Sequence, residues 1–371
     1  MAEYPDSAAF YQDGELSAND IVSLVRLEIQ QAQGYDFDVL SEDRSKALDF
    51  YHGNTSSPYI PEATAGRSNV VSMDVHDCVN SALAEVLPMM QASAVEFPPL
   101  FRDDEPQAQL ESDMIARLLQ EAGFDEIAYS ACHSALLQGL GWVNVEYRDV
   151  PRVERHVYDD PDYEIDPLIL DRISEEGGKV TQDGDRVVIT RETMQRQLII
   201  DCVAPENIIF SPSRGQYELE DLRFVAERKI MSVSQLVEDY GLTGVEAMGV
   251  PDYNEHYNAS GYARRERYAE SSTDTTGGYQ SQSQEKEVWC CYFDIAIRKN
   301  GPLEKHYLVI AGEHLLESRP VPFQPWVSCS PIPMPHRIQG RGLFQVMEDI
   351  QVSKTDMLRI LIDNATVANG S

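Results

Sequence analysis

The segment from residue 331 to residue 369 limits the fold more than any other part of the chain. It opens with prolines at positions 331, 333 and 335, which exclude a helix and favour an extended arm. Between Gly342 and Gly370 there is neither proline nor glycine. Apolar residues recur there at helical spacing, so we predict one continuous helix from about residue 343 to residue 369, roughly 40 Å long.

This predicted helix is too long for an ordinary surface helix. It is also too polar to cross a membrane, because charged residues occur along its whole length. An arm that leads into a long helix, apolar on one side and charged elsewhere, suits packing against further copies of the same chain. The helix positions that we expect at such a subunit interface are Leu343, Val346, Ile350, Leu358 and Leu361.

The charge of the chain argues against a free DNA-binding protein. Its 371 residues include 30 Lys and Arg against 62 Asp and Glu, a formal charge of −32. A protein that binds DNA regardless of sequence needs a basic face. The same charge is compatible with a protein through which DNA slides, because an acidic wall does not hold phosphates.

Cysteine usage and the N-terminal sequence indicate a soluble protein that is intracellular when made. The six cysteines are scattered without a CxxC pair, which is typical of small buried side chains in a reducing compartment. The N-terminus lacks the basic-then-apolar layout of a signal peptide, and no apolar run reaches membrane length. We therefore expect no membrane partner.

Composition and turn signals divide the chain into five segments of an α+β protein. We expect a helical region at 1–148, a mixed α/β region at 149–249, a flexible polar loop at 250–285, a β-rich unit with the proline arm at 286–340, and the long helix at 341–371. In the first segment, helices are predicted from Ser17 to near Gly34, from Ser41 to His52, from Ser72 to a kink or end at Pro88, from Gln109 to Gln120 and from Asp125 to Gln138. Strands are predicted at 142–147, 186–190, 197–203, 287–298, 305–310 and 314–319.

No motif of a known catalytic or cofactor-binding site occurs. The phosphate loop, HExxH, GxSxG and the dinucleotide fingerprint are all missing, so we expect neither an enzyme nor a cofactor. Acidic clusters at Asp36/Asp38 and at 159–162 offer oxygen ligands for Mg²⁺ or Ca²⁺, although a solvated acidic loop is the commoner explanation. Cys132-His133 and His76-Asp77 are adjacent pairs without a third member, and core packing is their default explanation.

Four charged or polar residues near the C-terminus are candidates for contacts outside the subunit. His336 and Arg337 lie in the proline arm, where a contact with a neighbouring subunit and a local turn contact are equally good explanations. Lys354 and Arg359 on the predicted helix are candidates for facing DNA in a channel, with pairing to nearby carboxylates as the commoner alternative.

Several segments together resemble the portal proteins, or head-to-tail connectors, of tailed phages, in particular the podovirus type. They follow one another over most of the chain in the order and spacing of that family. The segments are Gly66-Arg-Ser-Asn-Val-Val-Ser-Met-Asp-Val75 with the helix behind it, Val203-Ala-Pro-Glu-Asn-Ile-Ile-Phe-Ser-Pro212 with Phe224–Arg228, and Pro335-His-Arg-Ile-Gln-Gly340 with Glu348–Thr355 and Leu358–Asn364.

The resemblance implies a structural protein of the virion, assembled in the host cytoplasm. It implies a ring, usually of twelve subunits, at one capsid vertex, through which double-stranded DNA enters during packaging and leaves during ejection. The implied partners are the terminase packaging motor, a tail adaptor, and capsid and scaffold proteins. The implied fold is a portal-like helical wing with a β-rich part and a long stem helix. Members of the family continue beyond this helix into a clip and a crown, so we expect the sequence to be part of a longer protein.

Two other functions stay open at the level of sequence. A carboxylate-dependent phosphohydrolase or nuclease would need acidic side chains from separate segments to converge on Mg²⁺. Another structural adaptor of the virion would share the structural role but lack a long stem helix.

Overall fold

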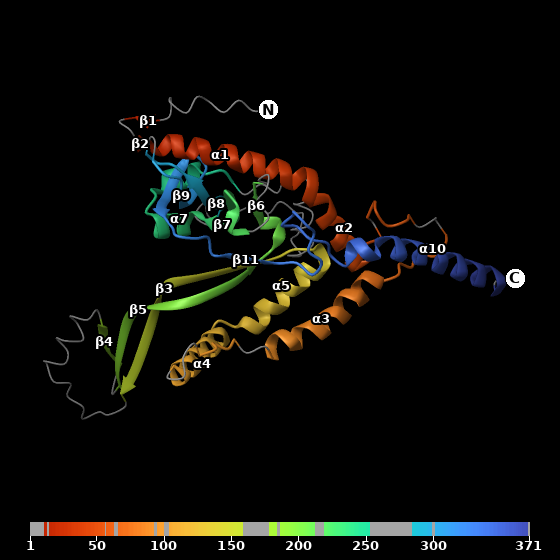
Figure 1. The fold of residues 1–371 in the computed structure, drawn as a ribbon, viewed down its shortest axis with the longest axis horizontal. Helices are drawn as coiled ribbons and strands as arrows, with labels where there is room; N and C mark the ends of the chain where they lie inside the picture. The colour runs from red at the N-terminus through yellow and green to blue at the C-terminus, as the bar shows by residue number, and fades with distance from the viewer. Residues whose placement is uncertain are drawn as a thin grey trace. The chain divides into compact units, whose positions relative to one another are not determined.

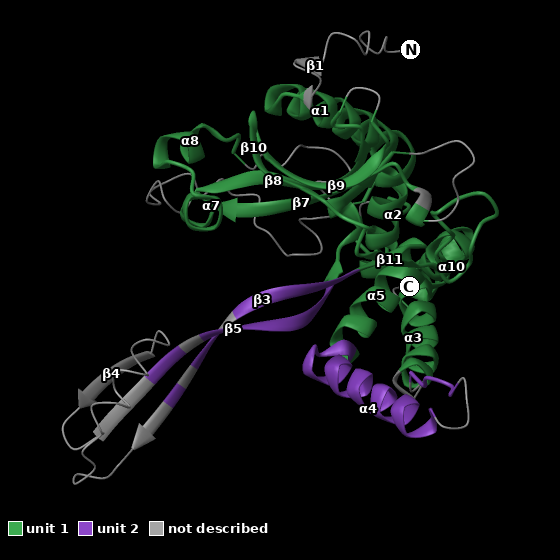
Figure 2. Cartoon of the chain, turned by 60° about the vertical axis from the view of Figure 1, so that its left-hand side comes forward, with its two compact units in different colours: residues 1–94, 125–143, 202–371 green, residues 95–124, 144–201 purple. Residues whose placement is uncertain are grey.

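The computed structural model describes residues 11–12, 15–55, 57–62, 66–92, 95–99, 104–158, 178–183, 186–211, 219–252, 284–298 and 301–369. Most of the polar segment predicted at 250–285 lies outside these residues. The chain forms two compact units, each discontinuous in sequence: unit 1 comprises 1–94, 125–143 and 202–371, and unit 2 comprises 95–124 and 144–201 (Figure 2). Each unit therefore draws on several of the segments distinguished above.

Unit 1 contains a five-stranded antiparallel sheet. Its strand order is β10 (His314–Pro320), β9 (Glu304–Ala311), β8 (Glu285–Ile295), β7 (Phe224–Ser232) and β6 (Ile208–Phe210). The register of β8 and β9 pairs Trp289 with Ile310 and Ile295 with Glu304, so these two strands are antiparallel neighbours. The combination of helices with antiparallel sheet confirms the predicted α+β class.

Both faces of this sheet are covered, which explains why apolar residues follow one another in the middle of its strands, as in Trp289–Phe293 of β8 and Leu308–Ala311 of β9. Helix α1 (Ala18–Tyr35) packs Val25 and Ile29 against the face that holds Cys291. Helices α7 (Val233–Tyr240) and α8 (Gly244–Gly249) pack against the face that holds Cys290 (Figure 1). Successive residues of a strand point to opposite faces, so the adjacent cysteines enter different cores.

The first two predicted helices are joined rather than separated by a loop. Helix α1 begins at the predicted capping box of Ser17 and Asp20, but it passes through Gly34 and continues by a π-helical turn (η2, Asp36–Leu40) into α2 (Ser41–His52). The end of α1 at Tyr35 agrees with the predicted end near Gly34, but helical structure continues beyond it, because a glycine only weakens a helix by about 1 kcal/mol and breaks no hydrogen bond. A buried ion pair between Arg44 Nη1 and Asp36 Oδ1, 2.5 Å long, fastens the turn.

A second core of unit 1 lies among helices. It joins α2, α3 (Asp74–Ala92), α5 (Phe124–Gln138) and the start of α10 (Phe344–Asn369), with the rings of Phe50 and Phe344 5.3 Å apart. Helix α3 contains Pro88 and continues for four residues beyond it, so the predicted end at this proline is not observed.

Unit 2 contains helix α4 (Glu105–Glu121) and most of a long pair of strands, β3 (Gly141–Tyr158) and β5 (Arg186–Val203), which are neighbours in the sheet although β4 lies between them in the sequence. We call this pair of strands the hairpin. The two strands predicted at 186–190 and 197–203 are one strand, and the strand predicted at 142–147 continues to Tyr158. Their sheet has the order β11 (Trp326–Cys329), β3, β5 and β4 (Gly178–Asp183).

The remaining elements are short. Strands β1 (Tyr11–Gln12) and β2 (Glu15–Leu16) pair with each other, and single 3-10 turns occur at η3 (Pro205–Asn207) and η4 (Leu219–Asp221). Among the described helices, none combines the length and the apolar character that a membrane span requires.

Candidate subunit interface

Helix α10 confirms the long helix that the sequence predicts, and it has two different faces. One face holds Gln351, Thr355 and Arg359, which are all buried. Together with Asp363 these residues follow one another at intervals of four, so they form a single line along the helix. We call these four residues the polar ladder.

The side chains of the polar ladder form hydrogen bonds with backbone groups of Phe50 and of the chain between Pro61 and Val75. Gln351 Oε1 accepts from the amide of Val75 at 2.8 Å, and its Nε2 donates to the carbonyl of Phe50 at 2.9 Å. Thr355 Oγ1 accepts from the amide of Ser72 at 3.1 Å, and Asp363 Oδ1 accepts from the amide of Ser68 at 2.8 Å.

Arg359, one of the two candidates for facing DNA, belongs to this ladder. Its side chain is buried, its Nε donates to the carbonyl of Val70 at 2.9 Å, and its Nη1 donates to the carbonyl of Pro61 at 2.6 Å. A guanidinium held by two backbone oxygens of its own subunit acts as a structural anchor.

Lys354, the other candidate, also contacts its own subunit. Its Nζ pairs with Asp74 at the first turn of α3. Burial alone raises the pKa of Asp74, but the hydrogen bonds from Lys354 and Ser72 outweigh it, and the pKa of Asp74 is lowered. The Lys354 side chain is still half exposed, so this ion pair adds little to stability.

The opposite face of α10 is apolar and uncovered within the described residues. Val346, Ile350, Met357 and Leu361 are 51%, 53%, 65% and 64% exposed. With 3.6 residues per turn, these four positions fall on the side of the helix away from the polar ladder. We call them the outer stripe, and Figure 1 shows α10 extending from the other helices toward its C-terminal end.

The predicted interface positions on the helix therefore separate into two groups. Val346, Ile350 and Leu361 lie on the outer stripe, whereas Leu343 packs partly buried against the helical core and Leu358 is half-buried. The approximate helical spacing alone did not separate these two groups.

The proline arm contains no helix, as predicted, but it is a closed loop rather than an extended arm. The amide of Arg341 donates to the carbonyl of Ile332 at 2.9 Å, and these two residues form a β-bridge. The chain reverses between them at Met334–Arg337, where His336 adopts a φ of 63°. Prolines fix their own φ but leave the residues between them free to turn.

His336 and Arg337, the two candidates in the arm, lie at this reversal and are exposed. A positive φ is unusual for a residue with a side chain. Burial raises the pKa of Tyr35, and the charge of Arg337 partly offsets this rise.

Glycines of two segments lie in contact where the arm meets the end of α5, namely Gly139 on one side and Gly340 and Gly342 on the other. Gly139 has a φ of 87°, and a Cβ placed there would lie 2.7 Å from the carbonyl oxygen of Gly340 and from the amide nitrogen of Gly342. The amide of Leu343 donates to the carbonyl of Leu136 at 2.7 Å, which caps the C-terminal end of α5. We call this contact the glycine junction. It sets where α10 begins.

These contacts bring together segments that carry the resemblance to portal proteins, because the chain from Gly66 to Val75 lies along the ladder of α10. The family model described as phage SU10 portal protein matches residues 21–371 of the chain. The chain belongs to this portal protein family. A search of curated proteins gave no match.

The polar ladder of this portal-family chain was missed at the level of sequence. Its signal was the spacing of Gln351, Thr355, Arg359 and Asp363 at intervals of four. Polar residues at this spacing resemble an ordinary exposed face of a helix. The spacing does not show that their partners are backbone groups far away in the chain.

Other candidate groups of the portal-family chain serve its own packing. Asp36 is buried against Arg44, Cys132 Sγ lies 3.1 Å from Met90 Sδ, and burial raises the pKa of Cys132. The acidic cluster at 159–162 lies outside the described residues. Within the described part of the chain, no three His, Cys, Asp or Glu side chains are grouped to hold a metal ion.

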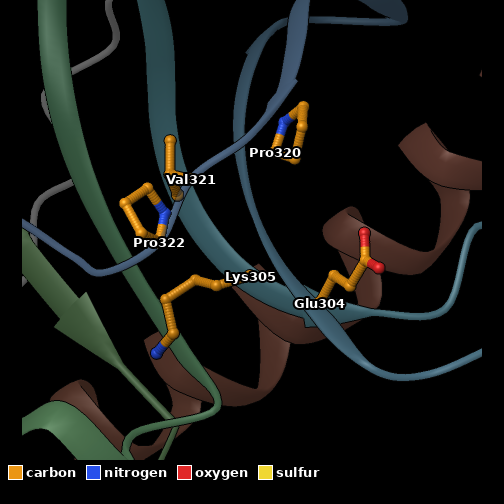
Figure 3. A pocket seen from close by; sticks show the side chains of 5 residues that line it. All are labelled: Glu304, Lys305, Pro320, Val321 and Pro322. Atoms are coloured by element: carbon orange, nitrogen blue, oxygen red, sulfur yellow. The ribbon is translucent and has the colours of Figure 1, made fainter.

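The described surface also has a hollow of roughly 390 Å³ where β9 begins and β10 ends (Figure 3). Glu304, Lys305, Pro320, Val321 and Pro322 line it. The ammonium group of Lys305 donates to the carbonyl of Leu222 at 3.2 Å, and Lys305 is largely buried. Its charge thus ties β9 to the start of β7, and the hollow lacks the converging polar groups of a ligand site.

Proposed function

We propose that this chain is the subunit of a ring-shaped portal at one vertex of a phage capsid, with twelve copies as the family resemblance implies. Double-stranded DNA passes through the ring during packaging and ejection. The terminase motor, a tail adaptor, and capsid and scaffold proteins dock on it. The role is structural, and no catalytic step is assigned to any residue.

The observation that carries the proposal is the difference between the two faces of α10. The polar ladder fixes one face to the subunit with hydrogen bonds from all four of its residues, whereas the outer stripe leaves Val346, Ile350, Met357 and Leu361 half or more exposed. A rigid helix with an uncovered apolar side suits association with another copy, because association removes this side from water. In a closed ring, each subunit uses two different surfaces, and closure fixes the number of copies.

The strongly acidic composition supports passage of DNA rather than its capture. With 62 acidic against 30 basic residues, the chain has a formal charge of −32, and a net negative charge repels phosphates. Lys354 and Arg359 are engaged within the subunit, so we propose that they stabilise the subunit that surrounds the DNA path.

Electron microscopy and analytical ultracentrifugation of the purified protein test this proposal. We expect particles of one size with a central opening, and a sedimentation coefficient far above that of a 41.8 kDa monomer. A protein that stays monomeric at its highest soluble concentration would contradict the proposed function.

A further inference from the structure

The hairpin of β3 and β5 has large exposed side chains, although β11 and β4 extend its sheet on either side. Each strand has 18 residues, so the hairpin is up to about 60 Å long, whereas β4 pairs only with residues 186–191 of β5. Tyr147, Val153 and Met194 on it are 61%, 58% and 68% exposed. Exposed apolar side chains on a narrow sheet indicate a surface that a partner covers.

The charge of the hairpin contrasts with that of the rest of the chain. The two strands carry six arginines and five carboxylates, whereas the whole chain carries 30 basic and 62 acidic residues. The five arginines whose side chains are described are exposed, and they are Arg148, Arg152, Arg155, Arg191 and Arg196. This near-neutral, arginine-rich hairpin thus belongs to a chain that is otherwise strongly acidic.

Carboxylates alternate with the arginines along the hairpin. Arg148 pairs with Glu146, and Arg196 Nε lies 3.3 Å from Asp149 Oδ1. Arginine forks bind carboxylates in the plane of the guanidinium. A protein surface with carboxylates and apolar groups fits the hairpin better than nucleic acid does, because the exposed Tyr147, Val153 and Met194 require apolar contacts that a phosphate backbone lacks.

We propose that the hairpin docks on the acidic surface of a second copy of this chain. The proposal rests on the ring proposed above, since a ring holds every hairpin at a fixed place beside an acidic neighbour. The exposed apolar side chains would be covered in that contact, and the arginines would meet carboxylates. The hairpin would then be a contact between subunits that is separate from the outer stripe of α10.

Photo-crosslinking in the full chain tests this inference. A benzophenone amino acid replaces Tyr147, which is exposed and aromatic, and assembled protein is irradiated. We expect adducts between two copies, with the attached peptide rich in Asp or Glu. Because exposed charges are screened by salt, the adduct yield should fall several-fold as the salt concentration rises from about 0.05 M to about 0.5 M.

Two double variants, each made in the protein that carries the benzophenone residue at position 147, distinguish an effect of the hairpin from a general effect of charge. R152E/R155E reverses two charges on the hairpin, and R26E/R117E makes the same change of charge at exposed arginines of α1 and α4. We expect the first variant to lower the adduct yield about tenfold and the second to leave it unchanged.

The outcomes distinguish this inference from the ring proposal. Rings without adducts between copies at position 147, or adducts to DNA in their place, overturn the docking of the hairpin and leave the ring standing. An equal loss of adducts in both double variants also overturns it. Protein that sediments only as a monomer overturns both proposals.

Discussion

At the scale of single residues, the glycine junction shows how strictly a position can depend on a distant segment. Gly139 needs its positive φ to end α5, and it lacks a Cβ because the backbone of Gly340 and Gly342 occupies that place. Both requirements apply to one residue. Gly34, inside α1, has neither a positive φ nor any atom within 4 Å of a Cβ placed on it.

We therefore predict opposite effects for the same substitution at these two glycines. Gly139→Ala should lower the free energy of unfolding by roughly 2–5 kcal/mol, from the unfavourable φ and the clash with backbone atoms. Gly34→Ala should raise it by about 0.5–1 kcal/mol, because alanine loses less conformational freedom in a helix. Urea denaturation followed by circular dichroism measures both. A Gly139→Ala protein as stable as the wild type would show that the junction is looser than described.

At the scale of elements, α10 is held mainly by hydrogen bonds from side chains to the backbone. Thr355 is 1% exposed, and its hydroxyl is the acceptor for the buried amide of Ser72. Removing an acceptor from a buried amide leaves that amide unsatisfied, which costs more than losing a hydrogen bond that water can replace.

The polar ladder is tested by replacing threonine with valine, which keeps the shape and removes the hydroxyl. Thr355→Val should lower the free energy of unfolding by about 1–3 kcal/mol and speed amide exchange in Ser68–Asp74. Thr366→Val on the same helix is the control, since its exposed hydroxyl bonds only to the carbonyl of Ile362, and it should change stability by less than about 0.5 kcal/mol. Equal effects at the two positions would mean that the ladder does not anchor the helix.

At the scale of the whole molecule, assembly depends on surfaces that a single subunit leaves exposed. Leu361→Asp places a charge on the outer stripe, where the side chain is 64% exposed, so the subunit itself should fold normally. The protein concentration needed for assembly should rise about tenfold or more, because the charge loses its hydration when two copies meet.

Thr366→Asp is the matched control for assembly, because it adds the same charge on the exposed last turns of α10 but away from the outer stripe. Sedimentation velocity over a range of protein concentrations compares the two variants. If both assemble like the wild type, the outer stripe is not the contact between subunits.

Much of the fold is predictable from neighbouring residues alone. The capping boxes at Ser17 and Ser232, the helix from 344 to 369 and the alternating strands of the five-stranded sheet follow from local spacing, because caps and periodicity act within a few residues. At Gly34 and Pro88 the local signals did not end the helical structure, which continues from α1 into a π-helical turn and in α3 for four residues beyond the proline.

The sequence by itself determined that the chain has a long two-sided helix, an acidic surface and the segments typical of portal proteins. The tertiary structure decided which side of that helix is available. Gln351 and Thr355 meet partners 276 and 283 residues away, and the loop of the arm reaches the end of α5 across 201 residues. The sequence does not identify such partners, because a backbone amide or carbonyl is the same whatever residue carries it.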